Sequence, residues 1–540
     1  MKKTSKKLKA KRHNNMAKSP TGITLVALVI TIIIIIILAT VTINMAFGDD
    51  GIIKRAEQAA DMYANDTAYT DESMANAAAY LDEMLNGVTG GGTDEPEEPF
   101  EPQPTPEPPT GGKEMEDMTN GIIEIKWLRG NTNNVTETPN APVIKTDLPS
   151  GTTMEQVVYD EGSNTWVAGT EYSYLPGTGS SNNTASHWAN AKVTKDGIDS
   201  YFVWIPRYAY RIIYFDSSDS KKAYQEGTIT EEEAVAGEKI IGYSDSRGIV
   251  DREGKKIESV ASTTHTMVSE DYFMVHPAFT AEEENGGWDS QIAGIWIGKY
   301  EASLANKVDG TNIVPSSSTD GDILLSENTD KTIVTKPGYN SWRYITIGNS
   351  YTNALAYDTN LNSHMLKNSE WGAVAYLTES KYGRNGTEIG FSNEGYITGG
   401  GAETGAIETN ADQSTTGNVY GIYDLRGGAF ERVASYYNGS DVNTTNLKNG
   451  ESFTSVNGPS TKFATAYTGT STSTAYKYGD ATYETSGWHS DLANFVNSIG
   501  PFFLRGGYYR TSASGAGVFC STNYDGTANY GHSFRVALVL

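Results

Sequence analysis

The sequence predicts an α+β protein, in which a long apolar helix near the N-terminus precedes a loop-rich globular head. Three observations favour this class. Residues 22–47 contain no charged side chain. Residues 96–109 are rich in proline and acids. After residue 115, short apolar runs alternate with clusters of Gly, Asn, Ser and Thr, which is typical of short strands joined by long loops.

Charge is distributed unevenly along the 540 residues. Residues 1–48 carry eight of the 41 basic side chains and none of the 66 acids, so the rest of the chain has a formal charge of −33. Such an acidic body excludes nucleic acid as a partner, because phosphate backbones require clustered cations. Cys520 is the single cysteine, so no disulfide can form within the chain.

The apolar segment 23–47 is long enough to cross a membrane. Twenty-five residues form about 37 Å of helix at 1.5 Å each, against about 30 Å of hydrocarbon. The basic residues before it place the N-terminus in the cytoplasm and the bulk of the chain outside. We therefore expect a single-pass membrane protein. A cleavable secretory signal is the alternative.

The basic leader 1–22 and the apolar run after it resemble the N-terminus of type IV prepilins. The resemblance implies cleavage by a prepilin peptidase between Gly22 and Ile23, methylation of the new N-terminus, and other pilin subunits as partners. Prepilins usually carry Glu at the fifth mature position, where this chain has Ala27. Assembly into a pilus therefore stays open.

Two further segments join the anchor to the head. Residues 48–88 carry apolar side chains at three- and four-residue spacing, which predicts an extracellular stalk helix. A solvated helix without a partner is the alternative. Residues 89–114 are a Gly, Pro and Glu linker, and the prolines favour an extended polyproline II spacer.

The head is expected over residues 115–540, with 115–200 as an optional separate small β unit. Candidate strands include "GIIEIKWL", "YFVWIPRYAYRIIYF", "IAGIWIGKYEAS", "WRYITIG", "NVYGIYDL" and "SFRVALVL". The best helix signal is "MLKNSEWGAVAYLTESKYG", where Ser369 is a candidate cap.

Several of these runs, in this order, resemble the fold shared by formylglycine-generating enzymes and C-type-lectin-like proteins. The resemblance covers about residues 200–540 and implies one lectin-like domain. Its matching segments are Val203-Trp204-Ile205-Pro206, Lys299-Tyr300-Glu301, Glu370-Trp371, Asn418–Leu425, Phe430-Glu431-Arg432-Val433, Arg505-Gly506-Gly507 and Ser533-Phe534-Arg535-Val536.

Catalysis is not expected, and no catalytic or metal residue is predicted. The oxidase of the resembled family needs two cysteines, whereas this chain has one. The seven histidines form no i,i+3 or i,i+4 pair, and calcium-dependent sugar motifs are absent. No cofactor is expected. Acids in "KYGDATYETSGWHSD" leave a structural calcium open, with simple solvation as the alternative.

The C-terminal tail has an unusual composition. Residues 508–533 contain no Lys, Glu, Gln, Met or Trp. These five types cannot be reached from an Asn codon ending in a pyrimidine when its adenines are replaced. The pattern resembles the variable proteins of diversity-generating retroelements, whereas an ordinary Gly, Ser and Asn loop is the alternative. The resemblance implies these candidate ligand-binding, varied positions: Tyr508, Tyr509, Arg510, Thr511, Ser512, Cys520, Ser521, Thr522, Asn523, Tyr524, Asp525, Asn529, Tyr530 and His532.

Together these features predict a membrane-anchored, pilin-like surface protein whose face at 508–532 binds a variable protein or glycan. Tyrosine offers a large rigid contact area, and Ser, Gly and Asn offer adaptable hydrogen bonds. On this interpretation Cys520 is exposed, and Phe534, Val536, Leu538 and Leu540 form the buried strand beneath, with Arg535 paired to a carboxylate. A structural minor pilin and an enzyme of different chemistry on the same scaffold are the alternatives.

Overall fold

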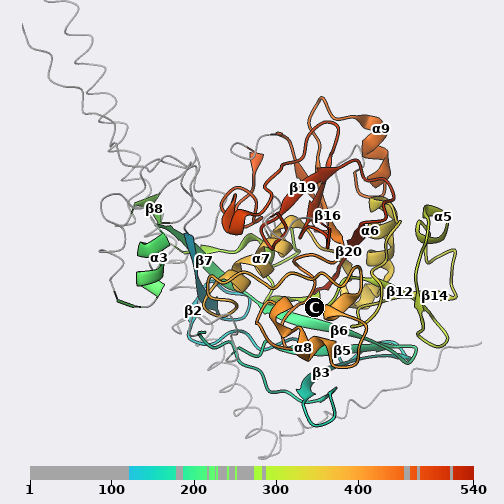
Figure 1. Ribbon diagram of the computed structural model, residues 1–540, viewed down its shortest axis with the longest axis horizontal. Coiled ribbons are helices and arrows are strands. Elements are labelled where there is room, and N and C mark those ends of the chain that lie inside the picture. The colour runs from blue at the N-terminus through green and yellow to red at the C-terminus, as the bar shows by residue number, and fades with distance from the viewer. Residues whose placement is uncertain are drawn as a thin grey trace, which may run out of the picture. The chain divides into compact units, whose positions relative to one another are not determined.

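The computed structural model describes residues 121–177, 186–215, 218–225, 227–228, 240–241, 250–251, 273–281, 287–454, 462–470, 475–510 and 515–540 (Figure 1). The chain divides into two units, 1–105 and 106–540, and every described residue belongs to the second. The leader with Gly22 and Ile23, the apolar helix, the stalk helix and the linker lie outside these residues. Within the described part, no helix is both long and apolar enough to traverse a bilayer.

The head is mixed, strand-rich and rich in loops, as the sequence predicts. Its helices are α3 (Ser218–Gln225), α5 (Ser318–Gly321), α6 (Ile347–Ala356), α7 (Asn368–Glu379), α8 (Ala406–Thr409) and α9 (Thr444–Leu447). Its strands are β1 (Gly121–Leu128), β2 (Val135–Thr136), β3 (Thr152–Asp160), β4 (Thr165–Ala168), β5 (Asn190–Lys195), β6 (Ile198–Pro206), β7 (Tyr208–Tyr214), β8 (Ile240–Ile241), β9 (Val250–Asp251), β10 (Met274–Val275), β11 (Gly294–Gly298), β12 (Ser303–Asn306), β13 (Asn312–Ile313), β14 (Lys331–Val334), β15 (His364–Met365), β16 (Phe430–Tyr437), β17 (Thr465–Tyr467), β18 (Phe502–Arg505), β19 (Ser521–Tyr524), β20 (His532–Phe534) and β21 (Val536–Leu538).

The largest sheet has seven strands in the order β15-β21-β11-β6-β5-β3-β4. Its centre is made by β6 and β11, where Trp204 pairs with Trp296. The C-terminal strand β21 lies between β15 and β11, so the end of the chain is an internal strand of this sheet. That position explains why both of its faces are buried, Ala537 and Val539 as well as Leu538.

The segment 121–200 is not a separate unit. Its first strand, β1, pairs with β7 in a sheet of order β2-β1-β7-β8-β9, whereas β3, β4 and β5 extend the seven-stranded sheet beside β6. Because β6 and β7 are separated by Arg207 alone, one continuous chain segment joins the two sheets. Residues 121–200 therefore contribute strands to the same two sheets as the segment that follows them.

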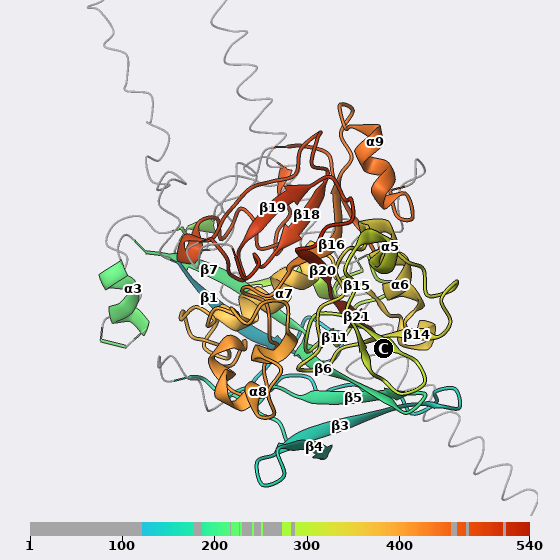
Figure 2. The ribbon, with the colours of Figure 1, turned by 45° about the vertical axis from the view of Figure 1, so that its right-hand side comes forward.

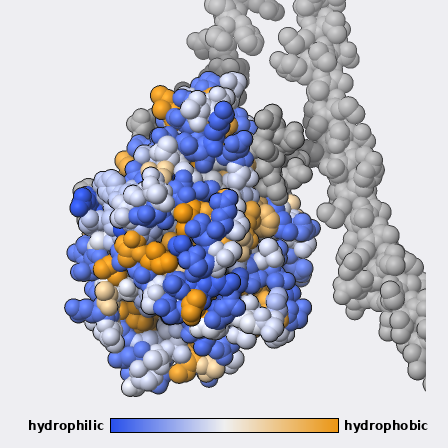
Figure 3. Space-filling model, turned by 90° about the vertical axis from the view of Figure 1, so that its right-hand side faces the viewer, coloured by the Kyte–Doolittle hydropathy of each residue, from blue (hydrophilic) through white to orange (hydrophobic). Residues whose placement is uncertain are grey.

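The third sheet carries the predicted variable tail. Its order is β17-β16-β18-β19, and β20 runs parallel to β16. Figure 2 shows β18 and β19 on one side of α7, and β3, β5 and β6 on the other. A small sheet of β13, β12 and β14 lies at another side of the head. The surface on the side of α5 and β14 is mainly hydrophilic, with hydrophobic residues in small groups (Figure 3).

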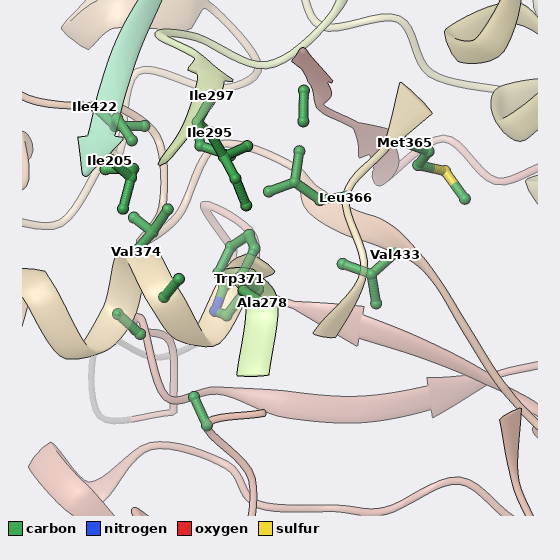
Figure 4. Packing of buried hydrophobic residues seen from close by; sticks show 14 of the residues in the cluster. Ile205, Ala278, Ile295, Ile297, Met365, Leu366, Trp371, Val374, Ile422 and Val433 are labelled. Carbon is green, nitrogen blue, oxygen red and sulfur yellow. The ribbon is translucent and has the colours of Figure 1, made fainter. Parts of the chain in front are cut away.

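Helix α7 lies inside the core, and all twelve of its residues are buried. In Figure 4, Trp371 and Val374 from this helix face Ile205 and Ile295 of the large sheet. A helix that is buried on all sides shows no clear amphipathic stripe. Its Trp371 indole also donates to the Val518 carbonyl oxygen at 2.6 Å, which ties the tail to the core.

The predicted helix is confirmed, but its cap is not Ser369. The N-cap residue is Lys367, and the Glu370 carboxylate accepts from the Lys367 backbone N–H at 2.8 Å. This is the returning half of a capping box, in which an acid in the first turn satisfies a free N–H. Ser369 lies within the first turn and is buried.

Two candidate strands are wrong. In "WRYITIG", Tyr344 has a φ of +59°, and helix α6 begins at Ile347 with Thr346 as its cap. In "NVYGIYDL", Asp424 has a φ of +67°, and the segment forms turns with one isolated bridge at Tyr423. Left-handed residues break strand geometry, and composition alone does not reveal them.

Candidate ligand-binding face

The tail reaches the surface through a tight turn after β18. Gly506 and Gly507 have φ values of +82° and +75°, which residues other than glycine rarely adopt. A Cβ on Gly507 would also lie 2.4 Å from the Cβ of Ala516. The Arg-Gly-Gly motif therefore turns the chain outward, so that Tyr508 and Tyr509 follow directly on the surface.

Four tyrosines and one arginine gather there, and we call Arg343, Tyr396, Tyr508, Tyr509 and Tyr530 the tyrosine face. The rings of Tyr396 and Tyr509 meet edge to face at 4.7 Å, and those of Tyr508 and Tyr509 at 6.1 Å. The Arg343 guanidinium lies 3.9 Å from the Tyr396 ring centroid, a cation–π distance. It also donates to the Tyr530 carbonyl oxygen at 2.9 Å.

This face is accessible without being loose. Tyr530 is 44% exposed, Arg510 is exposed, and Tyr508 and Tyr509 are half-buried. The Tyr509 backbone N–H donates to the Gly428 carbonyl oxygen at 3.1 Å. Partly covered rings held by backbone bonds lose little entropy on binding.

A second row of rings continues from Tyr508. Phe430 packs against Tyr508 at 5.2 Å and against His532 at 5.8 Å, and His532 meets Tyr524 edge to face at 4.4 Å. The Asn529 amide donates to the Tyr524 hydroxyl at 2.9 Å. The structure thus brings together seven predicted positions, Tyr508, Tyr509, Arg510, Tyr524, Asn529, Tyr530 and His532, but His532 is buried and so does not itself reach the surface.

Burial and neighbouring phenols set the protonation of these groups. Burial, with Tyr530 adding to it, raises the pKa of Tyr508 above its usual value. Burial also raises the pKa of Tyr396, although Arg343 acts in the opposite direction. Burial and Arg432 lower the pKa of His532, so this imidazole is neutral at neutral pH. The phenols of Tyr508 and Tyr396 are therefore kept neutral, Arg343 is buried beside Tyr396, and the exposed Arg510 supplies a positive charge next to Tyr509.

A buried ion pair supports the face from below. Arg535, between β20 and β21, donates from Nε to a Glu431 oxygen at 2.9 Å and from Nη1 to the Gly298 carbonyl oxygen at 2.8 Å. Nη2 donates to the Tyr423 carbonyl oxygen at 2.9 Å. The predicted pairing of Arg535 with a carboxylate is therefore confirmed. Breaking such a fully buried pair would leave a charge without compensation.

Two more acids complete this support. Glu301 accepts from the Ala429 backbone N–H at 2.8 Å and from the Ser341 hydroxyl. Asp424 accepts from the Gly399 backbone N–H at 2.9 Å. Burial, and then the neighbouring carboxylates, raise the pKa of Glu301, and burial raises the pKa of Asp424 to about 6. Fixed hydrogen bonds from four separate segments hold the chain below the tyrosine face.

Other predicted positions do not join the contact surface. Cys520 and Ser521 are buried, so the expected exposure of Cys520 is wrong. Burial, with Asp491 nearby, raises the pKa of Cys520 to about 12. These two residues connect the loop to β19, where Ser521 pairs with Arg505.

The remaining positions are half-buried or undescribed. Asn523 donates to the Phe495 carbonyl oxygen at 2.8 Å and so ties β19 to a distant segment, whereas Asp525 accepts from the Thr527 hydroxyl at 2.7 Å within its own loop. Thr522 lies on β19, opposite Leu504. Thr511 and Ser512 lie outside the described residues.

Sequence reasoning missed Arg343, Tyr396 and Phe430. They come from three segments far from the tail, and nothing in their local sequence marks them. The backbone bond from the Tyr344 N–H to the Asn529 carbonyl oxygen, 2.8 Å long, brings the first segment to the tail. The parallel pairing of Phe430 with His532 brings the third.

The acids of the loop 477–491 are buried in the head. Asp480 and Glu484 are buried, so they are not simply solvated. The Glu484 carboxylate accepts from the Tyr376 hydroxyl at 3.0 Å and from the Gly479 N–H at 2.6 Å. In the part of the chain that the structure describes, no group of three or more His, Cys, Asp or Glu side chains is arranged to hold a metal ion.

Comparison with known proteins leaves the chain without an assigned family. No protein-family model matches it. No curated protein matches it either.

Proposed function

We propose that this protein is a membrane-anchored, pilin-like surface protein whose lectin-like head binds a variable protein or glycan ligand through the tyrosine face. One observation carries the proposal: half-exposed tyrosine rings and the exposed Arg510 lie above a platform that contains the buried Arg535–Glu431 ion pair. Tyr and Arg are the side chains that most often dominate binding energy at interfaces. Their rigid attachment favours recognition over chemistry.

The anchor rests on sequence alone. The basic leader and the apolar run 23–47 support a single membrane span with the head outside the cell. The stalk 48–88 and the linker 89–114 would then set the distance between membrane and head. Prepilin-like processing at Gly22 belongs to the same proposal.

The burial of the candidate positions supports retroelement diversification, because some of them are exposed and others are buried. Tyr508, Tyr509, Arg510 and Tyr530 project to solvent or lie at its edge, where replacement leaves the platform intact. Cys520 and Ser521 have room for small side chains only, because protein interiors are close-packed. We therefore expect natural variants to differ widely at the first four positions and to keep small residues at 520 and 521.

A non-enzymatic role is part of the proposal. The single cysteine is buried, and its raised pKa disfavours the thiolate that would act as a nucleophile. The titratable groups beneath the face are bonded to backbone and to one another. These facts support recognition as the mechanism of the head.

An array experiment tests binding directly. The full chain in detergent would be applied to glycans and to extracellular proteins, as wild type and as a variant with Tyr508→Ala, Tyr509→Ala and Tyr530→Ala. We expect a ligand whose binding the triple variant loses by at least about a hundredfold, because interface tyrosines each contribute roughly 1 to 2 kcal/mol.

The matched control replaces three exposed apolar side chains elsewhere, Leu175, Val308 and Val314, by alanine. This control should bind as wild type does. Equal losses in both variants would show nonspecific adhesion. Wild-type binding by the tyrosine variant would place the contact surface elsewhere.

A further inference from the structure

A cavity on another part of the head has the composition of a small-molecule site. It measures about 510 Å³ and lies between strands β3, β4 and β6 on one side and the loop 401–405 with α8 on the other. Figures 1 and 2 both show α8 beside the seven-stranded sheet, across α7 from β18 and β19. No residue of the tyrosine face is among the described residues that line the cavity.

Two polar groups of its wall have no partner among the described residues. Both carboxylate oxygens of Glu408 are buried without a hydrogen bond, and the Trp166 indole N–H is buried without an acceptor. A buried carboxylate without a partner is costly, and so is an unpaired donor, although less so. A ligand that gives donors to Glu408 and an acceptor to Trp166 would satisfy both groups at once.

The charges of the described wall select a cation. Asp199, Glu403 and Glu408 line the cavity, and Lys336 is the one basic side chain among its described lining residues. The Lys336 ammonium lies 5.5 Å from the Tyr339 ring centroid. An anionic ligand would meet an excess of negative charge, so the wall disfavours it.

The remaining wall is aromatic. The Trp166 ring lies 5.2 Å from Tyr159 and 6.0 Å from Tyr201, and all three line the cavity. An indole ring attracts cations through its face. The protein already uses Trp166 in this way, because the Lys299 ammonium lies 4.8 Å from its centroid. Lys299 itself is held by the carbonyl oxygens of Val419 and Gly421, both at 2.6 Å.

We propose that this cavity binds a small organic ammonium compound that also carries an oxygen acceptor, such as an amino alcohol, amino acid or amino sugar. The ammonium group donates to Glu408, and the oxygen accepts from the Trp166 indole N–H. The aromatic walls cover the carbon skeleton. A neutral polyol satisfies the same hydrogen bonds but forgoes the charge pairing, so it binds more weakly.

Calorimetric titration of the full chain in detergent tests this assignment. The probes are ethanolamine, L-lysine and glucosamine, with glucose as the neutral counterpart of glucosamine and acetate as the anion. We expect at least one amine to bind and glucosamine to exceed glucose. Glu408→Gln, which keeps the shape and removes the charge, should weaken amine binding by about tenfold or more.

Two further variants keep the result interpretable. Trp166→Phe retains a ring and removes the indole donor, and we expect a several-fold loss of the same ligand. Glu327→Gln removes an exposed acid that does not line the cavity and should change nothing. Near-ultraviolet circular dichroism confirms that each variant is folded.

The outcomes separate this site from the tyrosine face. The triple tyrosine variant should bind amines as wild type does, whatever the array experiment shows. Binding of glucose as tightly as glucosamine would overturn the proposal in favour of a neutral polyol. Failure of every amine to bind, or unchanged affinity in Glu408→Gln, would overturn it outright.

Discussion

For Cys520, the local sequence predicts exposure and the tertiary structure shows burial. Its neighbours Ser521, Thr522 and Asn523 are polar, so the local sequence suggests an exposed loop. In the structure Cys520 is fully buried, beside Asp491 and Arg505. The segment is polar because β19 lies at the edge of its sheet, and only its first residues turn inward.

Burial makes this thiol unreactive, which is testable. With a pKa raised from 9.0 to about 12, its thiolate fraction at about pH 8 falls roughly a thousandfold. We expect a thiol reagent to label the native chain very slowly and the urea-unfolded chain at the rate of a free cysteine. Because the chain has one cysteine, the labelled fraction reports this site alone. Equal rates in both states would contradict its burial.

Arg535 shows the opposite case, in which sequence reasoning succeeded. An arginine within the run "SFRVALVL" of apolar neighbours must be buried, and a buried charge requires a partner. The identity of that partner, Glu431, followed from topology, because β16 carries Glu431 beside β20. The local sequence shows that Arg535 requires a partner, but the partner Glu431 lies far away along the chain.

Among the elements, β21 illustrates how the end of the chain secures the fold. As an internal strand between β15 and β11 it completes the seven-stranded sheet, whereas β4 lies at that sheet's edge. From the alternation of Phe534, Val536, Leu538 and Leu540, the sequence predicts one buried strand for this run. The run is instead two strands, β20 and β21, in two sheets, with Arg535 between them.

Two valines of the seven-stranded sheet, one on an internal strand and one on its edge strand, test the position of β21. Val536 on β21 is 1% exposed and Val167 on β4 is 40% exposed. We expect Val536→Asp to remove about 4 kcal/mol or more of the free energy of unfolding, because it buries a charge without a partner. Val167→Asp should change it by less than about 0.5 kcal/mol. Urea unfolding of both variants measures the contrast, and similar losses would refute the internal position of β21.

The loop 477–491 is joined to β7 and α7 by one acid. Glu484 accepts hydrogen bonds from the hydroxyls of Tyr210 and Tyr376, and burial raises its pKa from 4.5 to about 8. A raised pKa means that the folded state holds this proton more tightly than the unfolded state does. Its contribution is therefore complete below about pH 4.5 and is lost as the pH rises to about 8.

Replacing Glu484 by glutamine should remove this dependence. We expect the free energy of unfolding of Glu484→Gln, relative to wild type, to rise between about pH 5 and pH 8 by up to roughly 1.4 kcal/mol per pH unit. Urea unfolding at several pH values measures the difference, in which the other acids cancel. A difference that is constant with pH would show that Glu484 is ionised throughout.

For the whole head, the sequence predicted the class and several elements but not how they assemble. Strands β1, β6, β7 and β11 and helix α7 were evident from apolar runs. The sequence did not show that residues 121–200 contribute strands to two sheets, or that α7 is buried on every side. Both features depend on contacts between distant segments. The same limit applies to the tyrosine face, where the tail supplied Tyr508, Tyr509 and Tyr530, while Arg343 and Tyr396 come from elsewhere in the chain.

The whole-molecule account is that a rigid platform carries a replaceable surface. The platform is the buried network of Arg535, Glu431, Glu301 and Asp424 with the core around α7. The surface is the tyrosine face, whose rings mainly contact one another and Phe430. Stability and recognition are then carried by different residues.

Thermal unfolding of the full chain with Tyr508, Tyr509 and Tyr530 replaced together by alanine tests this separation most directly. We predict that the melting temperature falls by less than about 5 °C, because these rings are exposed or half-buried. The matched variant, with Tyr208, Tyr210 and Tyr376 replaced, removes three fully buried rings and should lose its cooperative transition. A collapse of the first variant like that of the second would show that the tyrosine face is core and would contradict the account.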